Sequence, residues 1–302
     1  MKIAFVGASG YGNTGDDTYP LVFSRFLPEH QLLFYNSDDP GELPGDIGMV
    51  VLGGGGLLYN NPDGADESAP SEHFQRMSFY LDWAISRDVP YGILSCGFQF
   101  RPGQERNFAR PLQPWRDYLQ QAEFITLRSP NCLRMARELS GRQDVRFYPD
   151  AGFLFEPDEA DMLPVRDMLT LVPAGPVRPE DPHTERWIRY CQSMGYDIVW
   201  LSMGAAVDDE PLLAWAREVH PASRILEQPT PAQAFRQIAA SRVVLSGRYH
   251  GMVFARASKV PFYIPEDVPY KLLHEDYAAA PYGAMGHIRA LQEAIAALHT
   301  SA

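Results

Sequence analysis

The sequence predicts an α/β protein built from two Rossmann-like, doubly wound domains that face a cleft. Short β-branched or aromatic runs alternate with longer stretches of helical period, which is typical of βαβ units and mainly parallel sheets. The 302 residues suffice for two domains of about 150 residues each. An acidic, proline-bearing segment over 151–166 interrupts the alternation, as an interdomain connection does. We therefore expect domains at 1–160 and 161–302.

In the first half, strands are expected where short apolar runs end at turn residues. The candidates are residues 2–6, 31–35, 47–52, 91–95, 124–127 and 145–148. Helices fill most of the gaps, and the clearest one follows Ser71, a suitable N-cap. Its apolar residues share one helical face, which we expect to pack on the sheet. They are Phe74, Met77, Leu81, Ala84 and Ile85.

The second half repeats this alternation. Its strand candidates are residues 168–172, 198–202, 224–226, 242–246 and 261–264. Helices are expected from Asp181, with Pro182 in the first turn, from Glu210, from Thr230, and over 252–258. Doubly wound sheets bind ligands outside the carboxyl ends of their strands, so two of them predict a site in the cleft. An enzyme is therefore favoured over a scaffold.

Composition excludes several classes of protein. The formal net charge is −12, from 26 Lys and Arg against 38 Asp and Glu, which disfavours nucleic acid as the main partner. No apolar run approaches the roughly 18 residues of a membrane span, and residues 3–6 are too few for the core of a signal peptide. Cys96, Cys132 and Cys191 lie far apart, which predicts neither a zinc site nor a disulfide framework. We expect a cytoplasmic protein with no integral membrane segment, metal or cofactor.

A glycine-rich loop follows the first strand, with four glycines in the nine positions from Gly7. Such a backbone can approach a ligand at a helix N-terminus, so the loop is a candidate cradle for an anion or a polar ligand. One alternative is a dinucleotide-binding loop with Asp38 and Asp39 as ribose acids. The spacing does not match G-x-G-x-x-G, and Asp16 and Asp17 would repel a pyrophosphate. The other alternative is a turn that only packs the strand against the helix.

A second glycine run, over 53–56, follows the buried strand. It lacks the Lys-Ser/Thr pair of a P-loop, so nucleoside triphosphate hydrolysis is not supported. Four glycines cost chain entropy, and something must therefore approach this backbone closely. Either the substrate or the neighbouring loop at Gly12 fits, and glycine alone does not separate the two.

The strongest signal for a site is Ser-Gly-Arg-Tyr-His-Gly over 246–251. It places the cation of Arg248, the imidazole of His250 and free backbone N–H groups at a strand-to-helix turn. An anionic substrate is held, and a proton transferred, at such a place. The remaining histidines have no such setting and are expected on the surface or in the core. They are His30, His73, His183, His220, His274, His287 and His299.

Several short motifs occur in an order that resembles the polysaccharide pyruvyl transferase family. They are the loop 12–17, the glycine run 53–56, Arg128-Ser129 and Pro149-Asp150 after strands, the turn 246–251 with the helix at 253–257, Val260-Pro261 and Lys271. The resemblance implies a GT-B-like fold. It also implies transfer of an enolpyruvyl unit from phosphoenolpyruvate to a sugar, which forms a pyruvate ketal.

That activity needs cations for the donor's carboxylate and phosphate, and an acid for its methylene carbon. Under the resemblance, Arg128 and Arg248 clamp the donor and His250 is the general acid. Asp16 or Asp17 either accepts a proton from the acceptor hydroxyl or caps the following helix. The residues expected to bind substrate are Gly12, Asn13, Gly15, Asp16, Asp17, Gly54, Gly55, Gly56, Ser246, Gly247, Tyr249, Gly251 and Lys271.

The partners implied are phosphoenolpyruvate and a saccharide or lipid-linked saccharide of a bacterial surface polysaccharide. Residues 1–160 would form the acceptor side and 161–302 the donor side. A glycosyltransferase that uses a nucleotide sugar is the alternative, because the same fold holds a diphosphate equally well. A third interpretation is a catalytically inactive carbohydrate-binding relative, which the intact Arg248 and His250 disfavour. Peripheral attachment at the inner membrane and the oligomeric state stay open.

Overall fold

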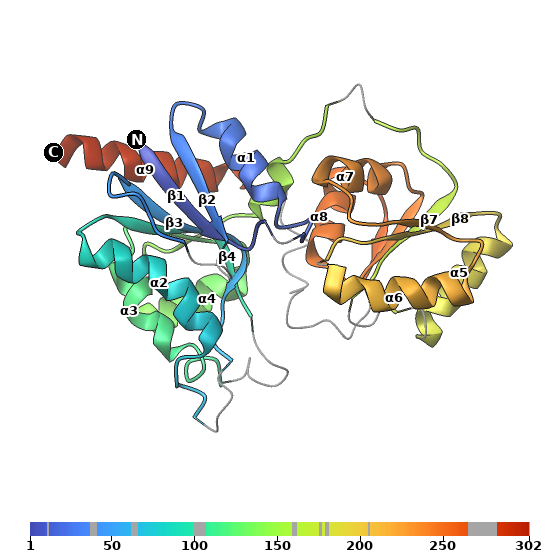
Figure 1. Ribbon diagram of the computed structural model, residues 1–302, viewed down its shortest axis with the longest axis horizontal. Helices are drawn as coiled ribbons and strands as arrows, with labels where there is room; N and C mark the ends of the chain where they lie inside the picture. Colours follow the sequence, from blue (N-terminus) through green and yellow to red (C-terminus); the bar gives the residue numbers. More distant parts are fainter. Residues whose placement is uncertain are drawn as a thin grey trace. The chain divides into compact units, whose positions relative to one another are not determined.

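The computed structural model contains two compact units (Figure 1). Unit 1 comprises Met1–Gly10, Tyr19–Leu154 and Tyr270–Ala302, and unit 2 comprises Tyr11–Thr18 and Phe155–Pro269. Each unit has its own parallel sheet with helices on both faces, which confirms the predicted pair of Rossmann-like layers. The structure describes residues 1–10, 12–36, 41–61, 66–99, 107–158, 162–174, 177–178, 181–204, 206–264 and 283–301.

Unit 1 is built on a six-stranded parallel sheet with the order β2-β1-β3-β4-β5-β6. Its strands are β1 (Lys2–Gly7), β2 (Gln31–Asn36), β3 (Met49–Leu58), β4 (Tyr91–Phe98), β5 (Ile125–Leu127) and β6 (Arg146–Phe147). The strand order reverses at β1, which pairs with β2 on one side and with β3 on the other. The carboxyl ends of β1 and β3 therefore flank the topological switch point of this sheet.

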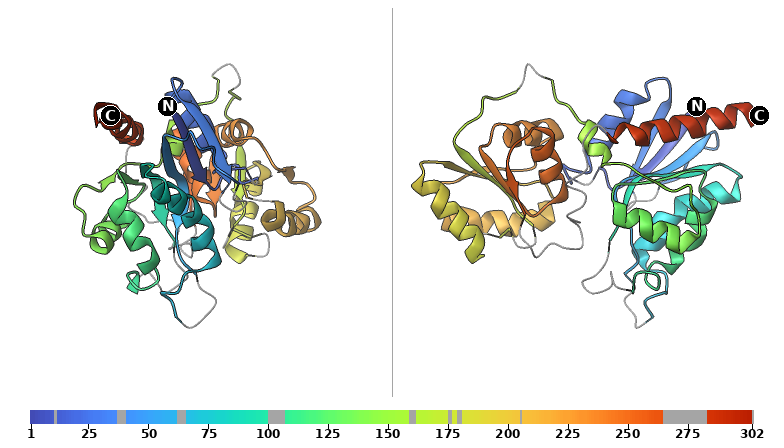
Figure 2. Two further views of the ribbon diagram at one scale, coloured as in Figure 1. Left: turned by 60° about the vertical axis from the view of Figure 1, so that its left-hand side comes forward. Right: turned by 180° about the vertical axis from the view of Figure 1, so that it is seen from behind.

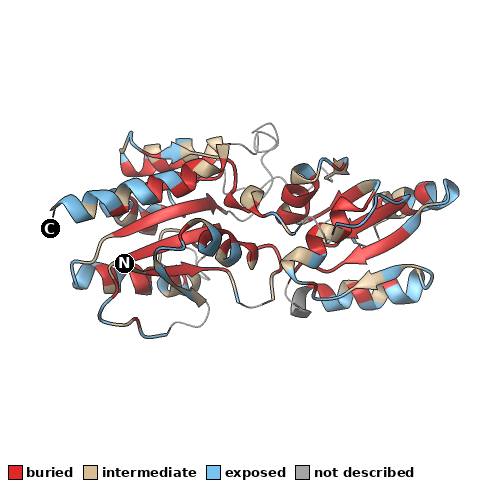
Figure 3. Cartoon of the chain, turned by 90° about the horizontal axis from the view of Figure 1, so that it is seen from above, coloured by how far each residue is buried: buried red, intermediate tan, exposed pale blue. Residues whose placement is uncertain are grey.

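Helices cover both faces of the unit 1 sheet (Figures 1 and 2). One face carries α1 (Thr18–Phe26) and α9 (Met285–Ser301), and Phe5 of β1 stacks on Phe23 of α1 at 4.8 Å. The opposite face carries α2 (Glu72–Ser86), α3 (Arg116–Gln121) and α4 (Pro130–Ser140). Phe74 of α2 and the fully buried Trp115 meet edge to face there, at 5.0 Å. Figure 3 shows the buried strands between helices whose outer faces are exposed.

Unit 2 is built on a five-stranded parallel sheet with the order β11-β10-β7-β8-β9. Its strands are β7 (Met168–Val172), β8 (Asp197–Leu201), β9 (Arg224–Leu226), β10 (Val243–Ser246) and β11 (Phe262–Tyr263). The helices α5 (Pro182–Ser193) and α6 (Ala206–Val219) pack on one face, around the buried Trp200. The helices α7 (Pro231–Ala239) and α8 (Tyr249–Ala257) cover the other face, where Phe235 and Phe254 meet at 5.3 Å. In this sheet the order reverses between β7 and β10.

Three helices begin where their capping residues predict. The Ser71 hydroxyl accepts a hydrogen bond from the Phe74 N–H at 3.2 Å, and the Asp181 carboxylate accepts from the N–H of His183 at 2.8 Å. Thr230 forms a complete capping box with Gln233, in which each side chain satisfies the other's backbone. Pro182 and Pro231 occupy the first turns of α5 and α7, where a missing N–H costs nothing.

The structure differs from the sequence expectation in several places. The strand β3 continues through the glycine run to Leu58, with an irregular register after Gly55, whereas the expected strand ended at residue 52. Helix α6 begins at Ala206 rather than at Glu210. The units also differ from a division at residue 160 in two segments, because Tyr11–Thr18 groups with unit 2 and the C-terminal helix with unit 1.

The cysteines are free and buried, and burial raises the pKa of the Cys96 thiol to about 12. That thiol is therefore protonated at neutral pH and is not a nucleophile. Within the described ranges, no helix has both the length and the apolar character to cross a membrane.

Candidate functional site

The turn between β10 and α8 lies at the switch point of the unit 2 sheet. The N–H of Gly247 donates to the carbonyl of Val172, the last residue of β7, at 2.9 Å. A Cβ on Gly247 would overlap the backbone of Ala174. Only glycine permits this approach, which brings the carboxyl ends of β7 and β10 together. The turn is thus fixed where ligands bind in sheets of this kind.

Ser246 shapes the same turn through its hydroxyl, which donates to the carbonyl of Arg248 at 2.8 Å and accepts from its N–H at 3.2 Å. Arg248 is the extended residue before α8, so the first N–H groups of that helix point toward the turn. Gly251 lies directly against the Ser246 hydroxyl, where a side chain would not fit. Tyr249, the first residue of α8, places its ring edge to face with the ring of His250.

The guanidinium of Arg248 is held from two sides. Its Nε donates to the carbonyl of Pro173 at 3.2 Å, and its Nη2 forms an ion pair with Asp209 of α6. The Asp209 side chain is fully buried, and its second oxygen accepts from the Ser202 hydroxyl at 3.0 Å and the Gly204 N–H at 2.8 Å. No sequence motif singles out Asp209, because its contact with Arg248 joins residues 39 apart.

The glycine-rich loop packs on this end of unit 2. The Asn13 side chain accepts hydrogen bonds from the N–H of Gly15 at 3.2 Å and of Asp16 at 3.4 Å, which closes a tight turn before α1. The Thr14 hydroxyl donates to the carbonyl of Pro229 at 2.9 Å. Gly12 adopts a left-handed conformation, with φ of 83°. These contacts explain why a segment from the start of the chain belongs to unit 2.

Gly15 lies against the ring of His250, so the loop and the β10–α8 turn meet at this glycine. The Oδ1 atom of Asp16 is 3.9 Å from the Nδ1 atom of His250. Both side chains are largely buried, with His250 6% and Asp16 9% exposed. The structure therefore brings together Gly12, Asn13, Gly15 and Asp16 with the turn that carries Arg248 and His250. Asp17, on the same loop, is half-buried.

Arg128 belongs to unit 1, at the carboxyl end of β5, and is buried beside Asp150. Its Nη1 is 3.2 Å from Oδ2 of Asp150, and the Tyr19 hydroxyl donates to the same carboxylate at 2.9 Å. The N–H of Gly152 donates to its other oxygen at 2.7 Å. Gly97 of β4 leaves the space that the Arg128 guanidinium occupies. Arg128 is thus a fixed cation at the carboxyl ends of the unit 1 strands.

The glycine run in β3 also has close neighbours in unit 1. Gly54 and Gly55 have positive φ angles of 78° and 108°. The ring of Tyr19 lies directly on Gly54, and the Gly56 carbonyl accepts a hydrogen bond from the side chain of Gln99. The glycine run predicted that another group approaches this backbone closely. At Gly54 that group is Tyr19, in the first turn of α1.

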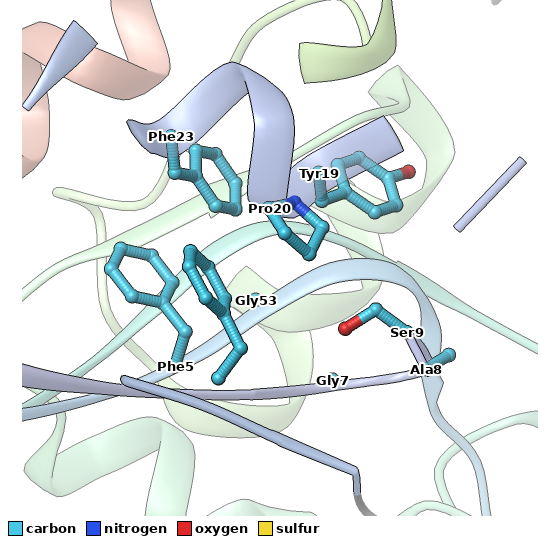
Figure 4. A pocket seen from close by; sticks show the side chains of 9 residues that line it. Phe5, Gly7, Ala8, Ser9, Tyr19, Pro20, Phe23 and Gly53 are labelled. Carbon is cyan, nitrogen blue, oxygen red and sulfur yellow. The ribbon is translucent and has the colours of Figure 1, made fainter. Parts of the chain in front are cut away.

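A small pocket opens at the switch point of unit 1 (Figure 4). The rings of Phe5 from β1 and Phe23 from α1 lie toward one side and Ser9 toward the other. Its lining residues are Phe5, Gly7, Ala8, Ser9, Tyr19, Pro20, Phe23, Phe34 and Gly53. The pocket combines an apolar floor with a hydroxyl and has room for about one water molecule.

His287 of α9 ties the loop before Asp150 to the sheet. A carbonyl oxygen only accepts, so the ring Nε2–H must donate to the carbonyl of Pro149 at 3.0 Å. The ring Nδ1 then accepts from the Thr126 hydroxyl at 2.8 Å, and that hydroxyl accepts from the Ser95 N–H at 3.2 Å. Burial lowers the pKa of His287 to about 4, so the ring is neutral. The sequence placed this histidine in the core or on the surface, and it lies in the core.

Lys271, Asp38 and Asp39 lie outside the described residues. Among the residues that are described, no group of three or more His, Cys, Asp or Glu side chains could hold a metal ion.

A family model described as polysaccharide pyruvyl transferase matches residues 11–264. The chain belongs to the polysaccharide pyruvyl transferase family. The match contains both the glycine-rich loop and the β10–α8 turn, which the structure places in contact. No curated protein matches the chain by sequence.

Solved structures show that this family member has a GT-B-like fold. S. aureus MnaA with UDP superposes with a TM-score of 0.57 and 11% identity, over 96% of this chain and 94% of that one. UDP-GlcNAc 2-epimerase from Neisseria meningitidis gives a TM-score of 0.57 and 9% identity, over 97% and 92%. An α-glucosyltransferase in complex with UDP gives 0.50 and 9%, over 97% and 90%. At such identities the likeness concerns the fold alone.

Alanine at position 15 is expected to destabilise the protein by about 1–3 kcal/mol, because the added methyl group would overlap the His250 ring. Urea unfolding followed by circular dichroism measures the change. Gly41→Ala is the control, since no atom lies within 4 Å of its Cβ position. In a His250→Ala background the cost of Gly15→Ala should shrink, because the clashing ring is gone. An equal cost in both backgrounds would contradict the contact.

Stability is expected to fall as the pH drops from 6.5 toward 4. The folded state keeps His287 neutral with a pKa near 4, whereas the unfolded chain takes up its proton near 6.5. The stabilisation is therefore complete above pH 6.5, and roughly 3 kcal/mol is lost by pH 4. His287→Gln should be less stable than the wild type at pH 7.5, by a gap that narrows on acidification. His299→Gln, on the exposed side of α9, should leave the pH dependence unchanged. If the difference in stability between His287→Gln and the wild type did not change with pH, this prediction would be wrong.

Proposed function

We propose that the protein is a phosphoenolpyruvate-dependent pyruvyl transferase. It transfers an enolpyruvyl unit to a saccharide or lipid-linked saccharide and forms a cyclic pyruvate ketal. The observation that carries the proposal is the β10–α8 turn of unit 2, where Arg248 and His250 lie beside the Gly12–Asp17 loop. Family membership supplies the reaction class, and this turn supplies a cation and a proton donor of the right kind.

In this proposal, Arg248 and the first turn of α8 bind the carboxylate and the phosphate of phosphoenolpyruvate. The Nε and Nη2 atoms of Arg248 bond Pro173 and Asp209, and we assign the outer edge of the guanidinium to a carboxylate or a phosphate. The N-terminal N–H groups of α8 add donors beside it. In this proposal Arg128 is a second clamp residue, and its ion pair with Asp150 sets the direction of its guanidinium.

His250 is the general acid of the reaction. Its proton adds to the methylene carbon of phosphoenolpyruvate, which leaves positive charge on C2 shared with the bridging oxygen. One sugar hydroxyl attacks C2, the C2–O bond to phosphate breaks, and a second hydroxyl attacks in turn. One of the two hydroxyl protons restores His250, and the other leaves with phosphate or solvent. Asp16, 3.9 Å from the ring, can accept a hydroxyl proton nearby.

The acceptor is assigned to the unit 1 side. The pocket between Phe5, Phe23 and Ser9 lies beside Gly7 at the carboxyl end of β1 and beside Gly53 of β3. We assign the product to a bacterial surface polysaccharide and the reaction to the cytoplasm, at the inner membrane when the acceptor is lipid-linked.

Asp209 does not supply the carboxylate that a nucleotide-sugar donor would need beside Arg248. A nucleotide site needs a carboxylate for the ribose hydroxyls. Asp209 is the carboxylate that contacts Arg248, but it is fully buried and both of its oxygens are engaged. It therefore serves the arginine rather than a ribose.

Phosphoenolpyruvate is expected to raise the melting temperature of the purified protein, whereas UDP, GDP, CMP and NAD should not. A ligand at about 100 times its Kd adds roughly 2.7 kcal/mol of stability, which a thermal shift resolves easily. Stabilisation by one nucleotide and not by phosphoenolpyruvate would indicate a glycosyltransferase instead.

Replacement of His250 by alanine should lower turnover by about 10²–10⁴-fold, the usual contribution of a general acid. Phosphate release from phosphoenolpyruvate in the presence of a saccharide acceptor measures it. Circular dichroism and retained phosphoenolpyruvate binding show that the variant is folded and competent. Turnover close to the wild-type rate would remove His250 from this role.

A further inference from the structure

We propose that Asp209 is a positioning residue, which fixes the direction in which Arg248 meets the donor's anion. The inference rests on the proposed function, since it assigns Arg248 to donor binding. It starts from the burial of the pair: the Asp209 side chain is 0% exposed and that of Arg248 is 18% exposed. Bulk water therefore does not compete strongly for the contact, and its geometry is set by the protein.

The contact uses one particular edge of the guanidinium. The Nε–H and the neighbouring Nη2–H form the side edge of the group, and they donate to Pro173 and Asp209. Nη1 and the second hydrogen of Nη2 form the outer edge. The guanidinium is planar and rigid, so these two contacts along one side prevent it from rotating about its long axis. The outer edge is thereby aimed as a unit, which allows a two-point contact with a carboxylate or a phosphate.

Asp209 is itself held in place. Its Oδ2 atom accepts from Ser202 and Gly204 at the carboxyl end of β8. The side chain of Gln228 clamps these two residues, because its Nε2 lies within 3.3 Å of the Ser202 hydroxyl and the Gly204 carbonyl. Gln228 adopts a φ of 42°, which costs energy for a residue other than glycine. The carboxylate thus has fixed donors on both oxygens, as a buried charge requires.

The absence of a side chain at Gly204 allows the loop after β8 to lie close to the ion pair. A Cβ at this position would overlap both the Arg248 guanidinium and the Asp209 carboxylate. The backbone of the loop after β8 therefore packs directly on the ion pair. Carboxylate, guanidinium and loop therefore form one packed unit.

The test is the affinity for phosphoenolpyruvate, measured by calorimetry on Asp209→Asn, Arg248→Lys and the double variant. Asp209→Asn keeps the shape and removes the charge, and we expect the Kd to rise about tenfold, the size of one charge-assisted hydrogen bond. In the Arg248→Lys background the same change should have little further effect, because lysine has no outer edge to aim. Equal losses in both backgrounds would show that Asp209 acts independently of Arg248 and would overturn the proposal, as would an unchanged Kd in Asp209→Asn.

The matched control is Asp167→Asn, which removes the carboxylate of a second Asp–Arg pair in unit 2, at the opposite ends of its strands. Asp167 bonds Arg242 at 2.8 Å, at the amino ends of β7 and β10, and should not affect binding. If Asp209→Asn does not fold, Ser202→Ala replaces it in the same cycle, with an expected loss of about threefold. If Ser202→Ala weakens phosphoenolpyruvate binding by the same factor in the Arg248→Lys background, the proposal is also overturned.

Inorganic phosphate separates this proposal from the proposed function. If the wild type binds no phosphoenolpyruvate, the proposed function fails, and the same variants are compared with phosphate as the probe. A weaker phosphate affinity in Asp209→Asn than in Asp167→Asn would still support the positioning role. Equal phosphate affinities in the two variants would overturn it.

Discussion

The approach of Gly247 to the backbone of Ala174 is the contact on which the unit 2 site depends. It joins the ends of β7 and β10 where the order of the sheet reverses, and no side chain larger than hydrogen fits there. Ser246 lies one residue before Gly247, and its hydroxyl bonds both the N–H and the carbonyl of Arg248. Helix α8 begins at the residue after Arg248. A cation and an imidazole thus stand two residues apart on a turn that the sheet itself holds rigid.

Most of the fold could be predicted because its signals are local. The strands at 168–172 and 224–226 are found with the expected bounds, and Ser71, Asp181 and Thr230 each cap the helix that they precede. The unexpected length of β3 has a physical reason. Glycine is a poor strand residue in isolation, yet Gly54 is retained in β3 because Tyr19 needs the space above it.

The site could be predicted only where its residues are neighbours in sequence. Arg248 and His250 share one turn, so their joint setting is visible in the sequence itself. Asp209 reaches that turn, and Gln228 reaches Gly204, only through the winding of the sheet, and His287 reaches Thr126 across 161 residues. Their identities carry no signal on their own, since a buried carboxylate or histidine has the same letter as an exposed one.

The interleaving of the two units has a consequence for how the chain is made. Residues 11–18 complete unit 2, but they are synthesised about 150 residues before its first strand, β7. Helix α9, which fastens the Pro149 loop of unit 1, is synthesised after all the residues of unit 2. Unit 1 therefore cannot reach its final packing until the residues of unit 2 have been made, and neither unit corresponds to one contiguous segment of the chain. Because these contacts join residues far apart in the sequence, we expect both units to complete their packing slowly and late in folding.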